Sequence, residues 1–306
     1  MEFPRGLAIL PKIDLGMKDF FLSTTFAPRG SRLGEILELC FRYGFRHIEL
    51  GSTHDYEGDP QAIVRCFQFE YLVHNYFPPP QESFILNIAS LDETIYRRSI
   101  NQIFRSIDFC DEIGARLYTF HPGFLTDPKG ESQDPSNYDF KFSDERLAKA
   151  DYQNAFQRMV EAISQIISYG QKRRVPIALE TEGTFYRNRH LLMQKPEEYC
   201  NFFRYFSPQD IRINLNLGHL HLAASFFNFR VQDFVDLVAN YVVAMEMSHS
   251  EGLRDEHRPL CEDGWYWDII TDPRFQRIYK ILELRNTSID EISQNARMIR
   301  HRLSKN

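Results

Sequence analysis

Short runs of apolar and β-branched residues alternate with longer segments of helical periodicity along almost the whole chain. The runs predict eight strands, at residues 20–24, 46–50, 71–74, 116–121, 176–182, 211–216, 242–248 and 278–284. Between them, apolar residues recur at helical spacing in residues 32–44, 92–114 and 154–170. The first and last of these segments end in glycine, which is a common helix stop.

A strand followed by a helix, repeated about eight times, predicts an α/β fold in which a parallel sheet closes on itself. We therefore expect a (β/α)8 TIM barrel, a single domain over residues 1–306. A doubly wound open sheet is the rival arrangement, but no GxGxxG motif follows the early strands. Residues 122–150 are too long for a plain strand-to-helix loop, so we interpret them as an active-site insertion or lid.

Composition narrows the class of protein. The net charge of −6 gives no general attraction to nucleic acid or to acidic membranes. It does not exclude a local basic groove. Five cysteines without a CxxC pair indicate reduced thiols. The N-terminal residues do not resemble a signal peptide, and no stretch approaches the ~18–20 apolar residues of a membrane span. We expect a soluble, cytoplasmic protein with no membrane partner, and leave its oligomeric state open.

Polar side chains stand at the carboxyl end of nearly every predicted strand. They are Glu49, His74, His121, Glu180 with Glu182, Asn216, Glu246 and Glu283. In a parallel barrel these ends converge on one mouth, where catalytic groups sit. Each residue alone is better explained as structural or solvated, but together they favour a metal site, because imidazoles and carboxylates are the usual ligands of Zn, Mn and Fe.

Four stretches carry a resemblance to a known family. They are "FILNIASLDETIYRRSINQIFRSIDFCDEIGARLYTFHPGF" (84–124), "VPIALETEG" (175–183), "INLNLGHLHLAAS" (213–225) and "DEHRPLCEDG" (255–264). Together they resemble the endonuclease IV-like branch of the xylose isomerase-like TIM barrels (AP endonuclease family 2), over about residues 70–285. Sugar phosphate isomerases and epimerases are relatives in the same superfamily.

The resemblance implies up to three divalent metal ions, Zn and/or Mn. Two of the implied ligand sets are intact: His74, His121 and a bridging Glu180 for the first ion, and His219, Asp255 and His257 for the third. The second set would be Glu180, Asn216, Glu246 and Glu283. The family has Asp in place of Asn216 and His in place of Glu246. Because these two changes offset each other, we predict a metal-competent site of oxygen ligands that favours Mn or Mg over Zn. His249 is an alternative ligand.

The loop that would contact the substrate differs in sequence from that of the DNA-specific enzymes. "IELGSTHDYEGDP" (48–60) is acidic and replaces their DNA-probing F-x-x-N-P-R-x-W loop, and its "IELG" is more typical of sugar isomerases and epimerases. Phe77 stands where the family has a tyrosine, which would preserve stacking without a hydroxyl. A small phosphorylated or sugar substrate is therefore favoured over DNA.

Three functions follow from these residues. The first is metal-dependent phosphoester hydrolysis, with Glu180 bridging the ions and Glu283 positioning or deprotonating water. The second is a sugar or sugar-phosphate isomerase or epimerase, in which one ion binds the substrate and Glu180 and Glu283 move a proton. The third is a degenerate barrel that binds a ligand without turnover. Asn216 supports the third function, and the cost of unpaired buried charges opposes it.

Overall fold

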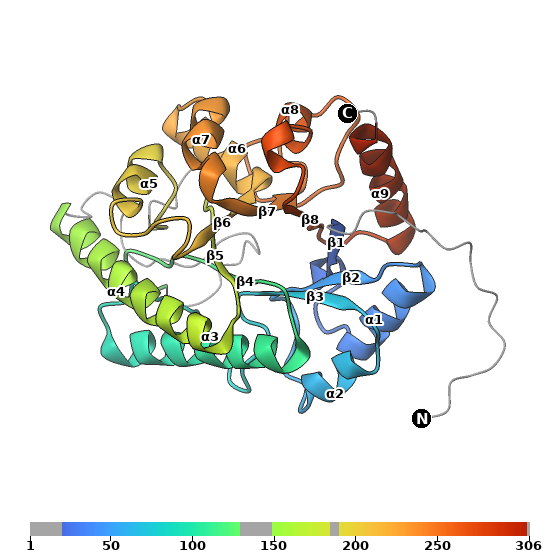
Figure 1. The fold of residues 1–306 in the computed structure, drawn as a ribbon, viewed down its shortest axis with the longest axis horizontal. Coiled ribbons are helices and arrows are strands. Elements are labelled where there is room, and N and C mark those ends of the chain that lie inside the picture. The colour runs from blue at the N-terminus through green and yellow to red at the C-terminus, as the bar shows by residue number, and fades with distance from the viewer. Residues whose placement is uncertain (1–19, 129–148, 184–189, 305–306) are drawn as a thin grey trace.

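The computed structural model describes residues 20–128, 149–183 and 190–304. Its eight parallel strands close into a barrel in chain order, with β1 paired to β8 (Figure 1). The strands are β1 Phe20–Ser23, β2 His47–Leu50, β3 Glu70–His74, β4 Tyr118–Phe120, β5 Ile177–Glu180, β6 Arg212–Asn216, β7 Val242–Met247 and β8 Tyr279–Leu282. The predicted TIM barrel is thus confirmed.

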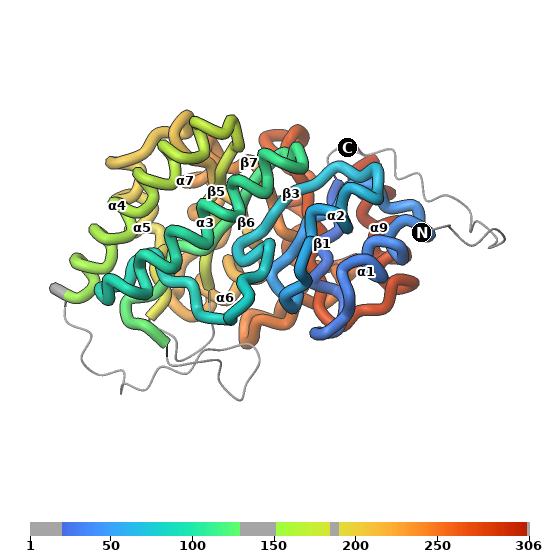
Figure 2. The backbone as a smooth tube through the Cα atoms, turned by 90° about the horizontal axis from the view of Figure 1, so that it is seen from below, coloured from blue at the N-terminus to red at the C-terminus, as the bar shows by residue number. Residues whose placement is uncertain are grey.

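Helices form the outer layer. They are α1 Leu33–Arg42, α2 Pro60–Arg65, α3 Glu93–Ile113, α4 Lys149–Arg173, α5 Pro196–Phe202, α6 Leu217–Phe227, α7 Val231–Val238, α8 Trp267–Ile270 and α9 Ile289–Leu303. The predicted helices at 32–44, 92–114 and 154–170 correspond to α1, α3 and part of α4. The long helices α3 and α4 lie side by side along one flank of the barrel (Figures 1 and 2).

The core has two parts, because residues of each strand alternate between the barrel interior and the helices. The interior layer consists of small and branched apolar side chains with one phenylalanine: Phe21, Leu72, Leu117, Ala178, Ala244 and Ile281. A much larger cluster fills the space between strands and helices. Apolar side chains therefore fill the barrel interior, and the polar residues lie at the carboxyl ends of the strands.

Several predicted strands extend past the observed ones at this mouth. The prediction ended the fourth, fifth and eighth strands at residues 121, 182 and 284, but β4, β5 and β8 end at Phe120, Glu180 and Leu282. His121, Glu182 and Glu283 consequently lie just beyond the hydrogen-bonded ladder. This difference matters for function, because residues that leave the ladder can turn their side chains toward one another.

Of the predicted insertion at 122–150, residues 129–148 lie outside the described residues, and α4 begins at Lys149. The described part of the connection is held by Asn87. Its side-chain oxygen accepts hydrogen bonds from the backbone N–H groups of Ala89 (3.0 Å) and Phe124 (2.8 Å), and its amide nitrogen donates to Asp127 (2.7 Å). One buried asparagine thus ties the segment before α3 to the segment after β4.

Among the described residues, no helix combines the length and the apolar character that a membrane span requires.

Asn87→Ala would leave the backbone N–H groups of Ala89 and Phe124 buried without acceptors. Each such group costs about 1–3 kcal/mol, so for the two groups we expect urea denaturation to show a loss of about 2–6 kcal/mol in unfolding free energy. The control Asn101→Ala changes an exposed residue of α3 and should stay within about 0.5 kcal/mol of wild type. Similar losses in the two variants would contradict the role of Asn87.

Candidate metal centre

The barrel mouth gathers the predicted ligands from several different strands. His74, Glu180 and Asn216 are the last residues of β3, β5 and β6, whereas His121 and Glu283 directly follow β4 and β8. Glu246 lies one residue before the end of β7 and is 1% exposed. Because all the strands are parallel, residues far apart in the chain meet in one buried cluster.

The first predicted set lies together. Ligand atoms of His74, His121 and Glu180 are within 4.8 Å of one another. His121 presents Nε2 to Glu180 Oε2 at 3.6 Å, while its Nδ1 lies 2.6 Å from Glu182 Oε1. A carboxylate behind the imidazole is the usual arrangement of a metal-binding histidine, since it fixes the ring and leaves the other nitrogen free. His74 differs, because its Nδ1 lies 2.8 Å from the hydroxyl of Thr119 and also 3.5 Å from Glu180 Oε2.

The third predicted set also lies together. His219, Asp255 and His257 offer ligand atoms within 4.8 Å of one another. His219 Nδ1 lies 3.0 Å from the backbone oxygen of Thr181, so Nε2 faces Asp255 Oδ1 at 3.5 Å. The backbone of His257 has φ 46°, in the left-handed region that non-glycine residues rarely adopt. Such strain concentrates at functional sites, where the surrounding structure holds it.

In the second predicted set, the side-chain amide of Asn216 points its nitrogen, not its oxygen, toward the other predicted ligands. Asn216 is the N-cap of α6, and its Oδ1 accepts a hydrogen bond from the backbone N–H of His219 at 3.1 Å. Its Nδ2 therefore faces the mouth and donates to Glu180 Oε1 (3.0 Å) and Glu246 Oε2 (2.7 Å). Glu283 Oε2 lies 3.0 Å from His257 Nδ1. Asn216 thus links two carboxylates as a donor in this geometry, and its metal ligation stays a prediction.

Buried atoms without partners test whether these residues fit metal ions. Among the described residues, Glu180 Oε2 and both carboxylate oxygens of Glu49 are buried and make no hydrogen bond of regular geometry. Leaving such atoms unsatisfied is costly, and coordination of a cation satisfies them. Neutral imidazoles and carboxylates are the ligands that Zn²⁺ and Mn²⁺ prefer. The residues of the first and third sets therefore fit divalent metal ions.

The electrostatics of the cluster fall into two groups. Burial opposes ionisation throughout, but His121, His74 and His219 outweigh it at Glu180 and lower its pKa. Burial lowers the pKa of His121, yet Glu180 and Glu182 raise it overall to about 9. By contrast, burial and the neighbouring carboxylates raise the pKa of Glu49 and Glu246 well above the usual range. The imidazoles thus hold Glu180 ionised, whereas Glu49 and Glu246 favour the protonated form until a cation is bound beside them.

Several positions differ from the sequence interpretation. His249 belongs to none of the metal-ligand groups among the described residues, and its Nε2 pairs with Glu251 at 3.0 Å. Phe77 does not line the mouth as a stacking platform: it is 1% exposed and packs edge-on against His54 and Phe109. It belongs to the hydrophobic core between the strands and the helices.

Sequence reasoning also missed two residues that position the ligands. Glu182 was noted as a strand-end residue but not as the partner of His121. Arg285 carried no signal at all, yet its Nη1 lies 2.9 Å from Asp255 Oδ2 and helps to hold that carboxylate ionised. A search for a carboxylate near each predicted histidine ligand would have found Glu182.

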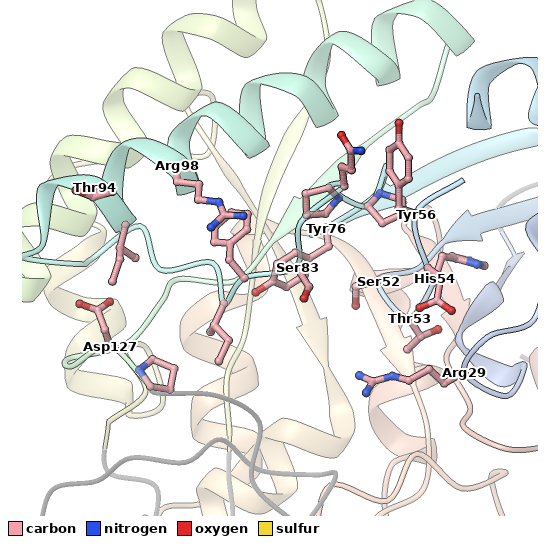
Figure 3. Close-up of a pocket in the computed structure, with 18 residues that line it drawn as sticks. Arg29, Ser52, Thr53, His54, Tyr56, Tyr76, Ser83, Thr94, Arg98 and Asp127 are labelled. Atoms are coloured by element: carbon pink, nitrogen blue, oxygen red, sulfur yellow. The ribbon is translucent and has the colours of Figure 1, made fainter. Parts of the chain in front are cut away.

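A cavity of about 820 Å³ lies among the segments that follow β1, β2, β3 and β4 and the start of α3 (Figure 3). Its lining combines aromatic and charged side chains, including Arg29, Tyr56, Tyr76, Phe84 and Arg98. None of the predicted metal ligands lines it. The acidic loop at 48–60 contributes Tyr56 to the wall, while its Glu57 and Asp59 cap α1 and α2 through backbone N–H groups.

Comparisons with known proteins agree with this architecture. The family model described as "Xylose isomerase-like TIM barrel" matches residues 37–302. Among solved structures, a D-tagatose 3-epimerase-like protein has a TM-score of 0.70 at 17% identity and covers 94% of this chain and 97% of its own. Endonuclease IV from Thermus thermophilus has a TM-score of 0.59 at 12% identity, over 94% of this chain and 100% of its own. At these identities the likeness shows a common fold.

A local sequence match points to the same superfamily. The probable endonuclease 4 of Aquifex aeolicus (strain VF5) is 40% identical over 40 residues. The match spans 13% of this chain and 14% of that protein. It is therefore a shared motif region, and it does not extend to the whole chain.

The raised pKa of His121 predicts proton-coupled metal binding. Below about pH 9 the ring is protonated in the metal-free protein, so an ion at Nε2 must displace a proton. Affinity for Mn²⁺ should therefore rise about tenfold per pH unit from pH 7 toward pH 9 for each displaced proton, and then level off. Calorimetric titration in two buffers of different ionisation heat counts the released protons.

Glu182→Gln provides the matched control for this pH dependence. The substitution removes one of the charges that raise the pKa of His121, so the affinity should level off at a lower pH. It should also weaken binding about 10–100-fold, as expected when the partner of a ligand histidine is lost. Affinity independent of pH in the wild-type protein would contradict the assignment.

Proposed function

This chain belongs to the xylose isomerase-like TIM barrel family, and we propose that it is a metal-dependent phosphoester hydrolase that acts on a small substrate. The observation that carries this proposal is the set of His219, Asp255 and His257, in which both histidines are buried and Asp255 is partly buried. A single-ion isomerase has no use for a further set of two imidazoles and a carboxylate, whereas phosphoester hydrolysis uses several ions that share one substrate.

The proposed ligand sets divide the cluster around Glu180. His74 and His121 would hold an ion on one side of this carboxylate, and His219, Asp255 and His257 would hold another beyond it. Divalent ions at these positions, Zn²⁺ or Mn²⁺, supply Lewis-acid activation of water and neutralise charge on a phosphate. Asn216, Glu246 and Glu283 remain proposed ligands of a further ion together with Glu180.

The chain's own residues would then orient and move protons. Glu182 holds the ring of His121 so that Nε2 faces Glu180, and the Thr119 hydroxyl contacts Nδ1 of His74. Glu283 stands at the end of β8 with a lowered pKa: burial opposes ionisation, but His257 outweighs it. An ionised carboxylate in this position would accept a proton from an attacking water.

The substrate is proposed to be small because of the loops that border the centre. The acidic segment 48–60 repels a polyanion such as DNA, and it builds one wall of the 820 Å³ cavity. Arg29 and Arg98 are positive charges in that cavity, which suits a phosphorylated ligand with room for a second group. Tyr56 and Tyr76 offer aromatic faces to its apolar part.

The alternative function is a divalent-metal sugar or sugar-phosphate isomerase or epimerase. The observation that favours it is the similarity in fold to a D-tagatose 3-epimerase-like protein over 94% of this chain. In this case Glu180 and Glu283 would move a proton at the carbon next to a carbonyl. A panel of small phosphodiesters, abasic-site DNA, and ketose and aldose sugars separates the functions, since isomerase activity without phosphate release would overturn the hydrolase proposal.

Glu283→Gln tests the proton acceptor. Under the proposal we expect kcat to fall about 10²–10⁴-fold at saturating Mn²⁺. The control Glu262→Gln alters an exposed glutamate and should leave kcat unchanged. A kcat of Glu283→Gln close to that of the wild-type protein, with Mn²⁺ saturating in both, would exclude this residue as the base.

Asn216→Asp tests the second ligand set. The new carboxylate can still cap α6, but it replaces the amide that donates to Glu180 and Glu246. We expect a lower Tm in chelator, because three carboxylates then face one another, and Mn²⁺ affinity raised at least about tenfold by the added charge. Asn101→Asp is the surface control. An unchanged affinity would show that residue 216 contacts no ion.

A further inference from the structure

Glu49 is an unexplained buried carboxylate beside the proposed centre. It lies one residue before the end of β2 and is 0% exposed. Neither of its carboxylate oxygens makes a hydrogen bond of regular geometry to a described residue. Its neighbours in the adjacent strands, Ser23 and Leu72, bring no positive charge. A group of this kind is costly to bury unless something outside the chain compensates it.

The groups that Glu49 faces are a histidine and a second glutamate. Ligand atoms of Glu49, His74 and Glu246 lie within 4.8 Å of one another, and all three residues are buried. They come from β2, β3 and β7, so the set does not arise from one acidic loop. His74 Nδ1 lies 3.9 Å from Glu246 Oε1. The spacing is wide for direct hydrogen bonds and suits three ligands around a common cation.

Two asparagines hold the carboxylate of Glu246 in place beside Glu49. The amide nitrogens of Asn214 (2.6 Å) and Asn216 (2.7 Å) donate to the two oxygens of Glu246 and fix the plane of its carboxylate. Because the oxygen of Asn216 accepts the α6 cap hydrogen bond, an ion at the second predicted ligand set would require this amide to turn. Toward Glu49, by contrast, an ion would meet the carboxylates of Glu49 and Glu246 and the imidazole of His74.

We propose that Glu49, His74 and Glu246 form a divalent-cation position on the β2–β3–β7 side of the mouth. One imidazole nitrogen and two carboxylates make an oxygen-rich set, which suits Mn²⁺ or Fe²⁺ better than a thiolate-selected metal. The position shares His74 with the set of His121 and Glu180, so it is a second place for the ion that His74 holds. This inference rests on the proposed function, because it assumes that the centre binds divalent ions.

The shared histidine permits a sharp test by titration of the metal-free full-length protein with Mn²⁺, followed by electron paramagnetic resonance of the free ion. His121→Ala removes a ligand of the other set only. We expect this variant to retain an ion at His74 with Glu49 and Glu246. Adding Glu49→Gln to it should weaken that ion at least about tenfold. Adding Glu70→Gln instead removes a carboxylate from the start of β3, at the opposite end of the barrel. This control should leave the affinity for Mn²⁺ unchanged.

Each result decides the inference. If the His121→Ala protein binds Mn²⁺ equally well with and without Glu49→Gln, Glu49 is not a ligand, although the proposed function stands. If the wild-type protein binds no divalent ion, the proposed function fails together with this inference. Circular dichroism in chelator confirms folding, and Glu49→Gln should not lower Tm there, because it removes an uncompensated buried carboxylate.

Anomalous diffraction from wild-type crystals grown with Mn²⁺ needs no variant. We expect a peak about 2.2 Å from a Glu49 oxygen, with Glu246 and His74 as its other protein ligands. Peaks confined to the sets around His121 and Asp255 would overturn the inference.

Discussion

Glu180 is the carboxylate on which the arrangement of the mouth depends. Three histidines face it, with His74 and His121 nitrogens 3.5 and 3.6 Å from Oε2 and His219 Nδ1 3.2 Å from Oε1. A buried ionised carboxylate is stable only when opposite charge or strong donors surround it. The histidines meet that need at Glu180, whereas burial and the neighbouring carboxylates raise the pKa of Glu49 and Glu246 and favour their protonated forms. Divalent cations at the mouth would allow these carboxyls to ionise, which is the physical reason to place cations here.

The closed barrel makes this concentration of charge possible. Six apolar side chains, among them Phe21 and Ile281, fill the barrel interior next to the cluster. Water therefore cannot reach the carboxylates through the barrel interior. Each strand then contributes its last one or two residues, and the loops behind them supply positioning groups such as Glu182 and Arg285. Stability resides in the apolar layers, which leaves the mouth free to carry unfavourable charges that serve a function.

The sequence predicted the barrel and the membership of the cluster, because both depend on strand pattern and parallel topology. His74, His121 and Glu180 meet wherever parallel strands close, whatever their separation in the chain. The direction of the Asn216 amide could not be predicted in this way. It depends on the start of α6, where the cap takes the side-chain oxygen. The partners Glu182 and Arg285 escaped for a similar reason, since their contacts follow from loop geometry beyond the strand ends.

The central claim is that this mouth is a metal centre. Elemental mass spectrometry of the purified chain, stripped with chelator and then repleted with Zn²⁺ or Mn²⁺ and desalted, tests it most directly. The account predicts about two or more tightly held ions per chain, consistent with the shared Glu180 of a multi-ion site. A chain that retains no ion after repletion, while its circular dichroism stays that of a folded barrel, would contradict the account.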